Sequence, residues 1–266
     1  MKAAMATWGD HLYRKSVLAV AALEGGMAKI MLVWTLAISL ACGFRIAFAV
    51  SPIDGPVAFI QTALPYALIA ASPVAAYMLA SSVFPRGSLL QQPDIRLSRY
   101  GKWQNVNCLT ARQHPAFGPT GMMASLLIGM LLNVPVRSLE FLAAVPAMNG
   151  NAPLWGQMIF GMMTFDVVLM NFLSVLACVM ALRTVPWFPR LLLLVWGVDI
   201  VSQLAIAQMV GNAPGLPASV GSAMADLLSG NMKKVMISAT IWLPYLILSE
   251  RVNLTYRSRV AVEKKT

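Results

Sequence analysis

Six long apolar stretches constrain the fold of this chain more than any other feature of its sequence. A helix that crosses a bilayer needs about 20 mostly apolar residues. Six segments come near that length, at residues 30–50, 57–83, 122–145, 154–182, 191–210 and 223–248. Only 11% of the residues are charged, whereas an average soluble domain has about 25%. The sequence therefore predicts an all-α, polytopic transmembrane helix bundle with about six spans.

Two regions carry features that affect the boundaries of these spans. The third stretch contains Pro135, followed by Arg137 and Glu140, and proline removes a backbone donor from a helix. We expect the third helix to break or turn along the interface at this point. Residues 8–29 mix apolar and basic residues before the first span, which predicts a cytoplasmic or interfacial amphipathic helix at the N-terminus.

Basic residues lie almost entirely on one side of the predicted spans. Cytoplasmic connections of membrane proteins carry the excess of Lys and Arg. Sixteen basic residues lie in the N-terminal segment, the loop after the second span, the turn at 183–190 and the C-terminal tail, whereas the opposite connections hold only Arg137. Both termini are therefore expected to be cytoplasmic. The net charge of +10 reflects this topology, so nucleic acid is not an expected partner.

A long basic loop divides the chain in sequence. The predicted organisation is an N-terminal segment (1–29), a two-span front module (30–84), the basic cytoplasmic loop (85–117), a four-span back module (118–250) and a basic cytoplasmic tail (251–266). The basic residues of the loop are Arg86, Arg96, Arg99, Lys102 and Arg112. They would attract anionic lipid by about 1 kcal/mol for each Lys or Arg near the surface. The simpler interpretation is that they only set the topology.

The last span ends in a signature that resembles a known family. It reads Ile241-Trp242-Leu243-Pro244-Tyr245, followed by Ser249-Glu250-Arg251-Val252-Asn253-Leu254-Thr255-Tyr256. The pattern is similar to the C-terminus of a family of small four-span bacterial inner-membrane proteins, the domain of unknown function two-five-six-nine, over residues 115–259. The resemblance implies a multi-pass protein of the bacterial inner membrane and a four-helix module, and it implies no activity. The same residues are also explained as an anchor, because Trp and Tyr favour the membrane interface.

Ionisable residues inside the predicted spans are the strongest functional signal, because each costs about 2.5–3.5 kcal/mol on insertion scales. The residues that we single out for this reason are Arg45, Asp166, Asp199, Lys233 and Lys234. We expect the three basic residues, joined by Arg137, to form a cationic cluster in the outer leaflet, with the two aspartates as counter-charges. Such a pocket would bind a small anion or an anionic lipid headgroup. In the structural alternative, the basic side chains snorkel toward water and each aspartate pairs between helices.

Four alanines, Ala63, Ala67, Ala71 and Ala75, recur at every fourth position of the second span. Small residues at this spacing let another helix approach closely. The stripe predicts a helix interface, either within the bundle or with another membrane protein. Chance is the other explanation in a chain rich in alanine.

Catalytic and cofactor motifs are absent from the sequence. It has no H-E-x-x-H, G-x-S-x-G, Walker A or Rossmann glycine pattern, and its cysteines have no metal-ligand spacing. We therefore expect a non-enzymatic protein without a metal or a cofactor. The leading hypothesis is an accessory or scaffold subunit that packs against another membrane protein through the alanine stripe. The alternative is a carrier or binding protein for a small anion or anionic lipid that uses the charged residues.

Overall fold

The computed structural model describes residues 2–94 and 101–262, with side chains from residue 10 onward. The helices are α1 (Lys2–Ala47), α2 (Pro56–Val83), α3 (Cys108–Gln113), α4 (Met122–Ala144), α5 (Leu154–Leu182), α6 (Phe188–Gly211), α7 (Ala218–Leu248) and α8 (Glu250–Arg257), and the strands are β1 (Trp103–Asn105) and β2 (Arg259–Ala261). Five helices are long and apolar enough to cross a membrane, and a sixth span results if α7 and α8, bent by 72° at Ser249, are counted as one. The predicted all-α polytopic bundle is therefore confirmed.

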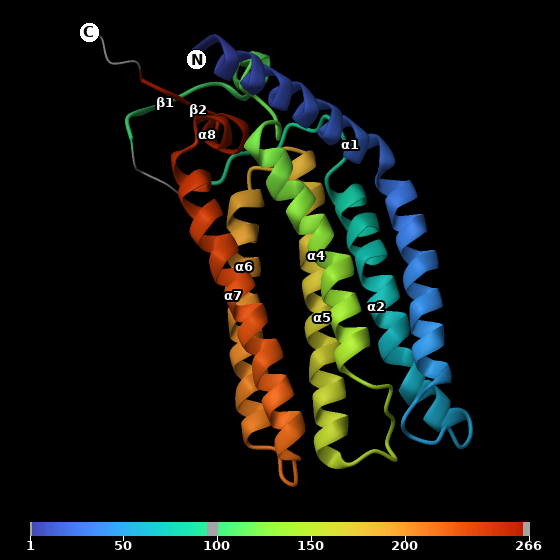
Figure 1. The fold of residues 1–266 in the computed structure, drawn as a ribbon. Coiled ribbons are helices and arrows are strands. Elements are labelled where there is room, and N and C mark those ends of the chain that lie inside the picture. Colours follow the sequence, from blue (N-terminus) through green and yellow to red (C-terminus); the bar gives the residue numbers. More distant parts are fainter. Residues whose placement is uncertain (1, 95–100, 263–266) are drawn as a thin grey trace.

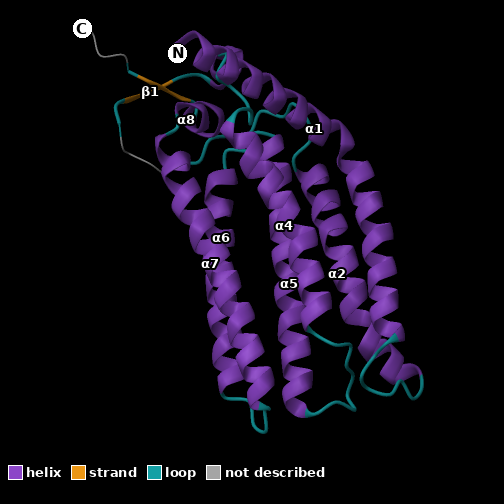
Figure 2. Cartoon of the chain, in the orientation of Figure 1, coloured by secondary structure: helices purple, strands orange, loops and turns teal. Residues whose placement is uncertain are grey.

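The long helices run side by side as one bundle, with α5 at its centre (Figure 1). Helix α5 packs against α2, α4 and α6, whereas α7 packs against α6 and α1 packs against α2 and α4. We call the end of the bundle where α1 begins the terminal end, because β2 lies there too (Figure 1). The opposite end, the loop end, holds the connections at 48–55, 145–153 and 212–217. Loops are confined to these two ends (Figure 2).

Helix α1 is continuous over its 46 residues. At 1.5 Å per residue such a helix is about 69 Å long, more than twice the roughly 30 Å of a bilayer core. Its first part curves over the terminal end of the bundle (Figure 1), and Val20 and Met27 are buried there. The predicted N-terminal helix at 8–29 therefore exists as the first part of the first span's own helix, with no break between them.

Helix α4 runs through Pro135 without interruption, so the expected break or turn at this residue is wrong. Val134, Arg137, Ser138 and Phe141 are all buried, and their spacing of three and four residues places them on one face of the helix. This face lies against α5. Arg137 consequently belongs to the interior of the bundle and not to an outer connection.

The apolar core is shared between the predicted front and back modules. A cluster nearer the terminal end joins Met31 of α1 and Ala76 of α2 to Leu127, Cys178 and other residues of the later helices. A second cluster nearer the loop end is built around the rings of Tyr66, Phe141 and Phe160, with centroids 5.8–6.1 Å apart. The boundary at 85–117 therefore separates spans in sequence, while their side chains pack into common clusters.

The C-terminal signature closes the terminal end of the bundle. Tyr256 is fully buried and its hydroxyl donates a hydrogen bond of 3.0 Å to the carbonyl oxygen of Ala181, at the end of α5. Arg257 is also buried and its Nη1 donates to the carbonyl oxygen of Leu246 at 2.8 Å. Strand β2, in the predicted tail, pairs antiparallel with β1 of the basic loop. Arg96 and Arg99 of that loop lie outside the described residues.

Candidate functional site

A buried arginine is the centre of the site. Arg137 is 7% exposed and lies on the core face of α4. Its Nε donates to Asp166 Oδ2 on α5 at 3.2 Å. Its Nη1 and Nη2 donate to Asp199 Oδ2 and Oδ1 on α6 at 3.2 and 2.6 Å. Asp199 thus forms the two-pronged pair with guanidinium that fixes orientation as well as charge, whereas Asp166 accepts a single bond from the arginine.

Two amide side chains extend this group of residues toward α7. Gln203 lies one helical turn after Asp199, and its Nε2 donates to Asp166 Oδ1 and to Asp199 Oδ1 at 3.3 Å each. Asn231 of α7 in turn donates from Nδ2 to Gln203 Oε1 at 3.4 Å. We call Arg137, Asp166, Asp199, Gln203 and Asn231 the polar layer. Asp199 lies halfway along α6, so the layer crosses the bundle near the middle of the spans.

The charges of the polar layer do not balance. Arg137 contributes one positive charge, while Asp166 and Asp199 contribute two negative charges when both are ionised. Asp166 is 1% exposed and Asp199 is 9% exposed. Buried charges are costly unless they are paired and hydrogen-bonded. One further positive charge or proton would neutralise the layer.

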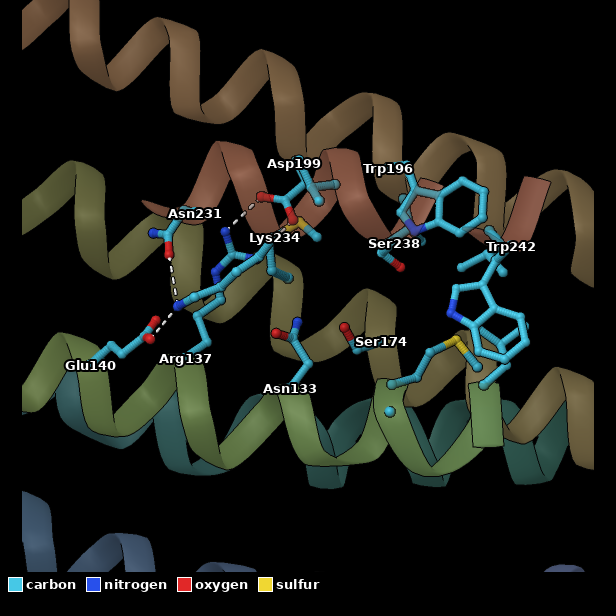
Figure 3. A pocket seen from close by; sticks show the side chains of 17 residues that line it. Asn133, Arg137, Glu140, Ser174, Trp196, Asp199, Asn231, Lys234, Ser238 and Trp242 are labelled. Atoms are coloured by element: carbon cyan, nitrogen blue, oxygen red, sulfur yellow. Dashed lines mark hydrogen bonds and ion pairs between the residues drawn. The ribbon is translucent and has the colours of Figure 1, made fainter. Parts of the chain in front are cut away.

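An ion pair beside the layer links α7 to α4. Lys234 Nζ contacts Glu140 Oε1, and it also lies 3.4 Å from Asn231 Oδ1. Both side chains are partly exposed, at 54% for Lys234 and 33% for Glu140. Figure 3 shows this pair beside Arg137 and Asp199. Because Lys234 already faces a carboxylate, it does not supply the charge that the polar layer lacks.

A pocket of about 230 Å³ opens on the terminal side of the polar layer, between α4, α6 and α7. One part of its lining is polar and includes Arg137, Asp199, Asn133, Asn231, Glu140 and Lys234. The other part is aromatic and apolar, with Trp196 and Trp242 (Figure 3). Apolar walls with a few convergent polar groups are typical of small-ligand sites, although this volume is slightly below the usual range of about 300–1,000 Å³. The pocket fits a small solute with a polar end and an apolar end.

A second pocket of about 500 Å³ lies between α6 and α7 on the loop side of the layer. Its lining on α6 runs from Gln203 to Gly211, whereas the first pocket touches α6 from Leu192 to Asp199. Most of its lining is apolar or small, including Leu204, Ala207 and Leu228. The polar layer therefore separates two pockets that follow each other along α6 and α7.

The structure brings together only part of the charged cluster expected from the sequence. Asp166 and Asp199 meet Arg137, and Lys234 lies next to them with Glu140. Lys233 is exposed. Arg45 lies in the last turn of α1, and α1 lies on the opposite side of the bundle from α7 (Figure 1). A single cationic cluster of Arg45, Lys233 and Lys234 is therefore not formed.

The alanine stripe lies on the outer surface of α2. Ala67, Ala71 and Ala75 are exposed and Ala63 is half-buried. The face of α2 that packs into the bundle instead carries Tyr66, Ile69 and other buried residues. Within the described chain, the stripe is thus not the surface by which α2 meets its neighbours.

Sequence reasoning missed Glu140 and Asn231 and placed Arg137 on the wrong side of an assumed helix end. The signal that could have found them was periodicity. Arg137 and Glu140 are three residues apart, as are Asn231 and Lys234, and this spacing places both members of each pair on one helix face. Reading these pairs as faces of continuous helices would have predicted one polar stripe on α4 and another on α7.

Comparisons with protein-family models, curated proteins and solved structures find no significant match for this chain. The resemblance of residues 241–256 to the four-span bacterial family therefore stays a prediction. Among the described residues, no cluster of three or more His, Cys, Asp and Glu side chains could hold a metal ion. The interpretation of the site accordingly depends on its own geometry.

Proposed function

We propose that this integral membrane protein is a carrier or binding protein for a small polar solute, held in the pocket beside the polar layer. The observation that carries the proposal is the buried group of Arg137, Asp166 and Asp199 bordering a pocket halfway across the bundle. Ionisable residues at this depth are expensive and mark substrate or ion pathways in membrane proteins. A purely structural pair would need no adjoining pocket.

The charges favour an amine or a zwitterion over a free anion. Both basic residues that line the pocket, Arg137 and Lys234, already contact carboxylates. An added anion would compete with those carboxylates, whereas an ammonium group would offset the excess negative charge of the polar layer. The aromatic part of the lining, at Trp196 and Trp242, would pack against the apolar end of such a solute.

Thermal unfolding in the presence of small solutes tests this proposal. The probes are short alkylamines, amino acids and carboxylates of matched size, added to the protein in detergent or nanodiscs. A ligand at about 100 times its Kd stabilises the folded state by about 2.7 kcal/mol. We expect an amine or an amino acid to raise the Tm, and Asp199→Asn to abolish that rise.

Asn133→Ala tests the pocket with less disturbance of the buried charges, because Asn133 lines the pocket without belonging to the polar layer. Ser125→Ala, at an exposed position of the same helix, is the matched control and should keep the full rise in Tm. The proposal is overturned if none of the three classes raises the Tm, or if Asn133→Ala and Asp199→Asn both respond like Ser125→Ala. Stabilisation by carboxylates alone would overturn the charge argument.

The exposed alanines of α2 favour a second candidate function, that of an accessory subunit. Ala67, Ala71 and Ala75 form a small-residue surface that no helix of the described chain covers, and such surfaces allow close helix contact in membranes. Ala71→Leu should then weaken retention of a partner protein in native mass spectrometry, while Leu68→Ala, also exposed on α2, should not. Equal spectra for the two variants would remove this candidate.

A further inference from the structure

The polar layer needs one more positive charge, and the elements around it do not provide one. Helix α5 carries no charged residue except Asp166, and α2, which packs against α5, carries none. Helix α4 contributes Arg137 and Glu140, and α6 contributes Asp199, with Arg190 in its first turn. On α7, Lys234 pairs with Glu140, and Lys233 and Asp226 are exposed. The excess negative charge therefore stays with the two aspartates.

The two carboxyl groups bond to the same two side chains. Asp166 Oδ1 and Asp199 Oδ1 each accept a hydrogen bond of 3.3 Å from Gln203 Nε2, and both carboxyl groups also accept from the Arg137 guanidinium group. Asp199 accepts hydrogen bonds from both Nη1 and Nη2 of Arg137, whereas Asp166 accepts one from Nε alone. Asp166 is also the more buried of the two. A buried charge is costly unless it is paired and hydrogen-bonded, so Asp166 is the carboxyl group of the two that a proton would neutralise at the lower cost.

The layer can be reached from both pockets. Asp199 lines the pocket on the terminal side and Gln203 lines the pocket on the loop side. Both residues belong to the polar layer, and Gln203 donates to both Asp166 and Asp199. Water in the pocket on the terminal side would contact Asp199 directly. Water in the pocket on the loop side would be separated from the two carboxyl groups by the side chain of Gln203.

We propose that the polar layer is a proton-binding site, in which Asp166 carries one exchangeable proton. The proton is taken from water in one pocket and returned to water in either. This inference rests on the same layer as the proposed function and deepens it, because the ammonium group of a solute and the proton would neutralise the same charge. Binding of such a solute would release the proton, which makes the carrier an exchanger of solute for H⁺.

Infrared spectroscopy of the full chain in lipid tests the proton directly, with no solute added. We expect the carbonyl-stretch band of a protonated carboxyl group at neutral pH, shifted in D₂O and also shifted when aspartate is labelled with ¹³C at its carboxyl carbon. Asp166→Asn and Asp199→Asn should each lose the band, since either change leaves one carboxylate opposite one guanidinium group. Asp226→Asn, at an exposed position of α7 outside the polar layer, is the control and should keep it.

A wild-type spectrum without this band at neutral pH would overturn the proposal, and so would a band that survives both aspartate variants or fails to shift with labelled aspartate. The labelled wild-type protein decides the question even if a variant does not fold. A band that is present while no probe solute raises the Tm would contradict the proposed function and leave the proton site standing. A solute that raises the Tm of a protein without the band would contradict the proton site and leave the proposed function standing.

Discussion

At the scale of single residues, Arg137 holds three helices together. It lies on α4 and bonds to carboxylates on α5 and α6. Removing one member of a buried ion pair costs about 3–5 kcal/mol, because the remaining charge is left buried without a partner. We expect Arg137→Leu to lower the Tm strongly. Arg137→Lys should lie between Arg137→Leu and the wild type, because lysine keeps the charge and loses the two-pronged geometry.

Arg45→Leu is the matched control for this prediction. Arg45 is half-buried at the end of α1, and its Nε has no hydrogen-bond partner among the described residues. Its replacement should change the free energy of unfolding by less than about 1 kcal/mol. Equal losses of Tm for Arg137→Leu and Arg45→Leu would show that Arg137 has no special structural role.

Tyr256 provides a second prediction at this scale. Its buried hydroxyl donates to the carbonyl oxygen of Ala181, and a typical intramolecular hydrogen bond contributes about 0.5–1.5 kcal/mol to stability. We expect Tyr256→Phe to destabilise the protein by this amount in thermal unfolding. Tyr245→Phe, at a half-buried position of α7, should have a smaller effect, and the opposite order would contradict the described contact.

At the scale of elements, α7 lies at the side of the bundle opposite α1 (Figure 1). It packs against α6 and α8, while the pocket lies between it and α4. The pair between Lys234 and Glu140 bridges this gap. Lys234 and Glu140 both line the pocket and are both partly exposed, so the bridge stands between the pocket and the outside of the bundle. It is therefore suited to control access to the pocket.

Cysteine reactivity measures this control. Ser238 lines the pocket one turn from Lys234, so Ser238→Cys in a Cys108→Ser background reports on access from water. We expect Lys234→Gln to raise its rate of reaction with a small maleimide several-fold. Exchanging the charges, with Lys234→Glu and Glu140→Lys together, should restore the slow rate, whereas an unchanged rate in Lys234→Gln would contradict a gating bridge.

The elements also show how far the sequence could be read. Hydropathy predicted α5 at its exact bounds, Leu154–Leu182, because a continuous apolar run is a local property. It did not predict an unbroken α4, because tolerance of Pro135 depends on neighbouring helices. The pairing of Arg137 with Asp166 and Asp199 joins three helices, so no single segment contains that information. The two aspartates could be predicted as site residues because a charged side chain inside an apolar span is energetically costly, and one segment of sequence is enough to recognise it.

At the scale of the whole molecule, the orientation in the membrane stays a prediction from the distribution of basic residues. The start of α1 and strand β2 both lie at the terminal end (Figure 1), which we expect to face the cytoplasm. Asp54→Cys at the loop end should react with an impermeant maleimide on intact cells in a Cys108→Ser background. Thr110→Cys at the terminal end should react only after permeabilisation, and the reverse pattern would invert the topology.

The proposed solute site and the proton site both depend on the contact between Arg137 and Asp199. A double-mutant cycle of Arg137→Leu and Asp199→Asn, followed by thermal unfolding in the same detergent, tests that contact most directly. We expect the double variant to be more stable than the sum of the single losses indicates, by about 2–3 kcal/mol, the upper range for residues in one ion-pair network. Losses that add within about 0.5 kcal/mol would mean that the two side chains do not interact and would contradict the polar layer.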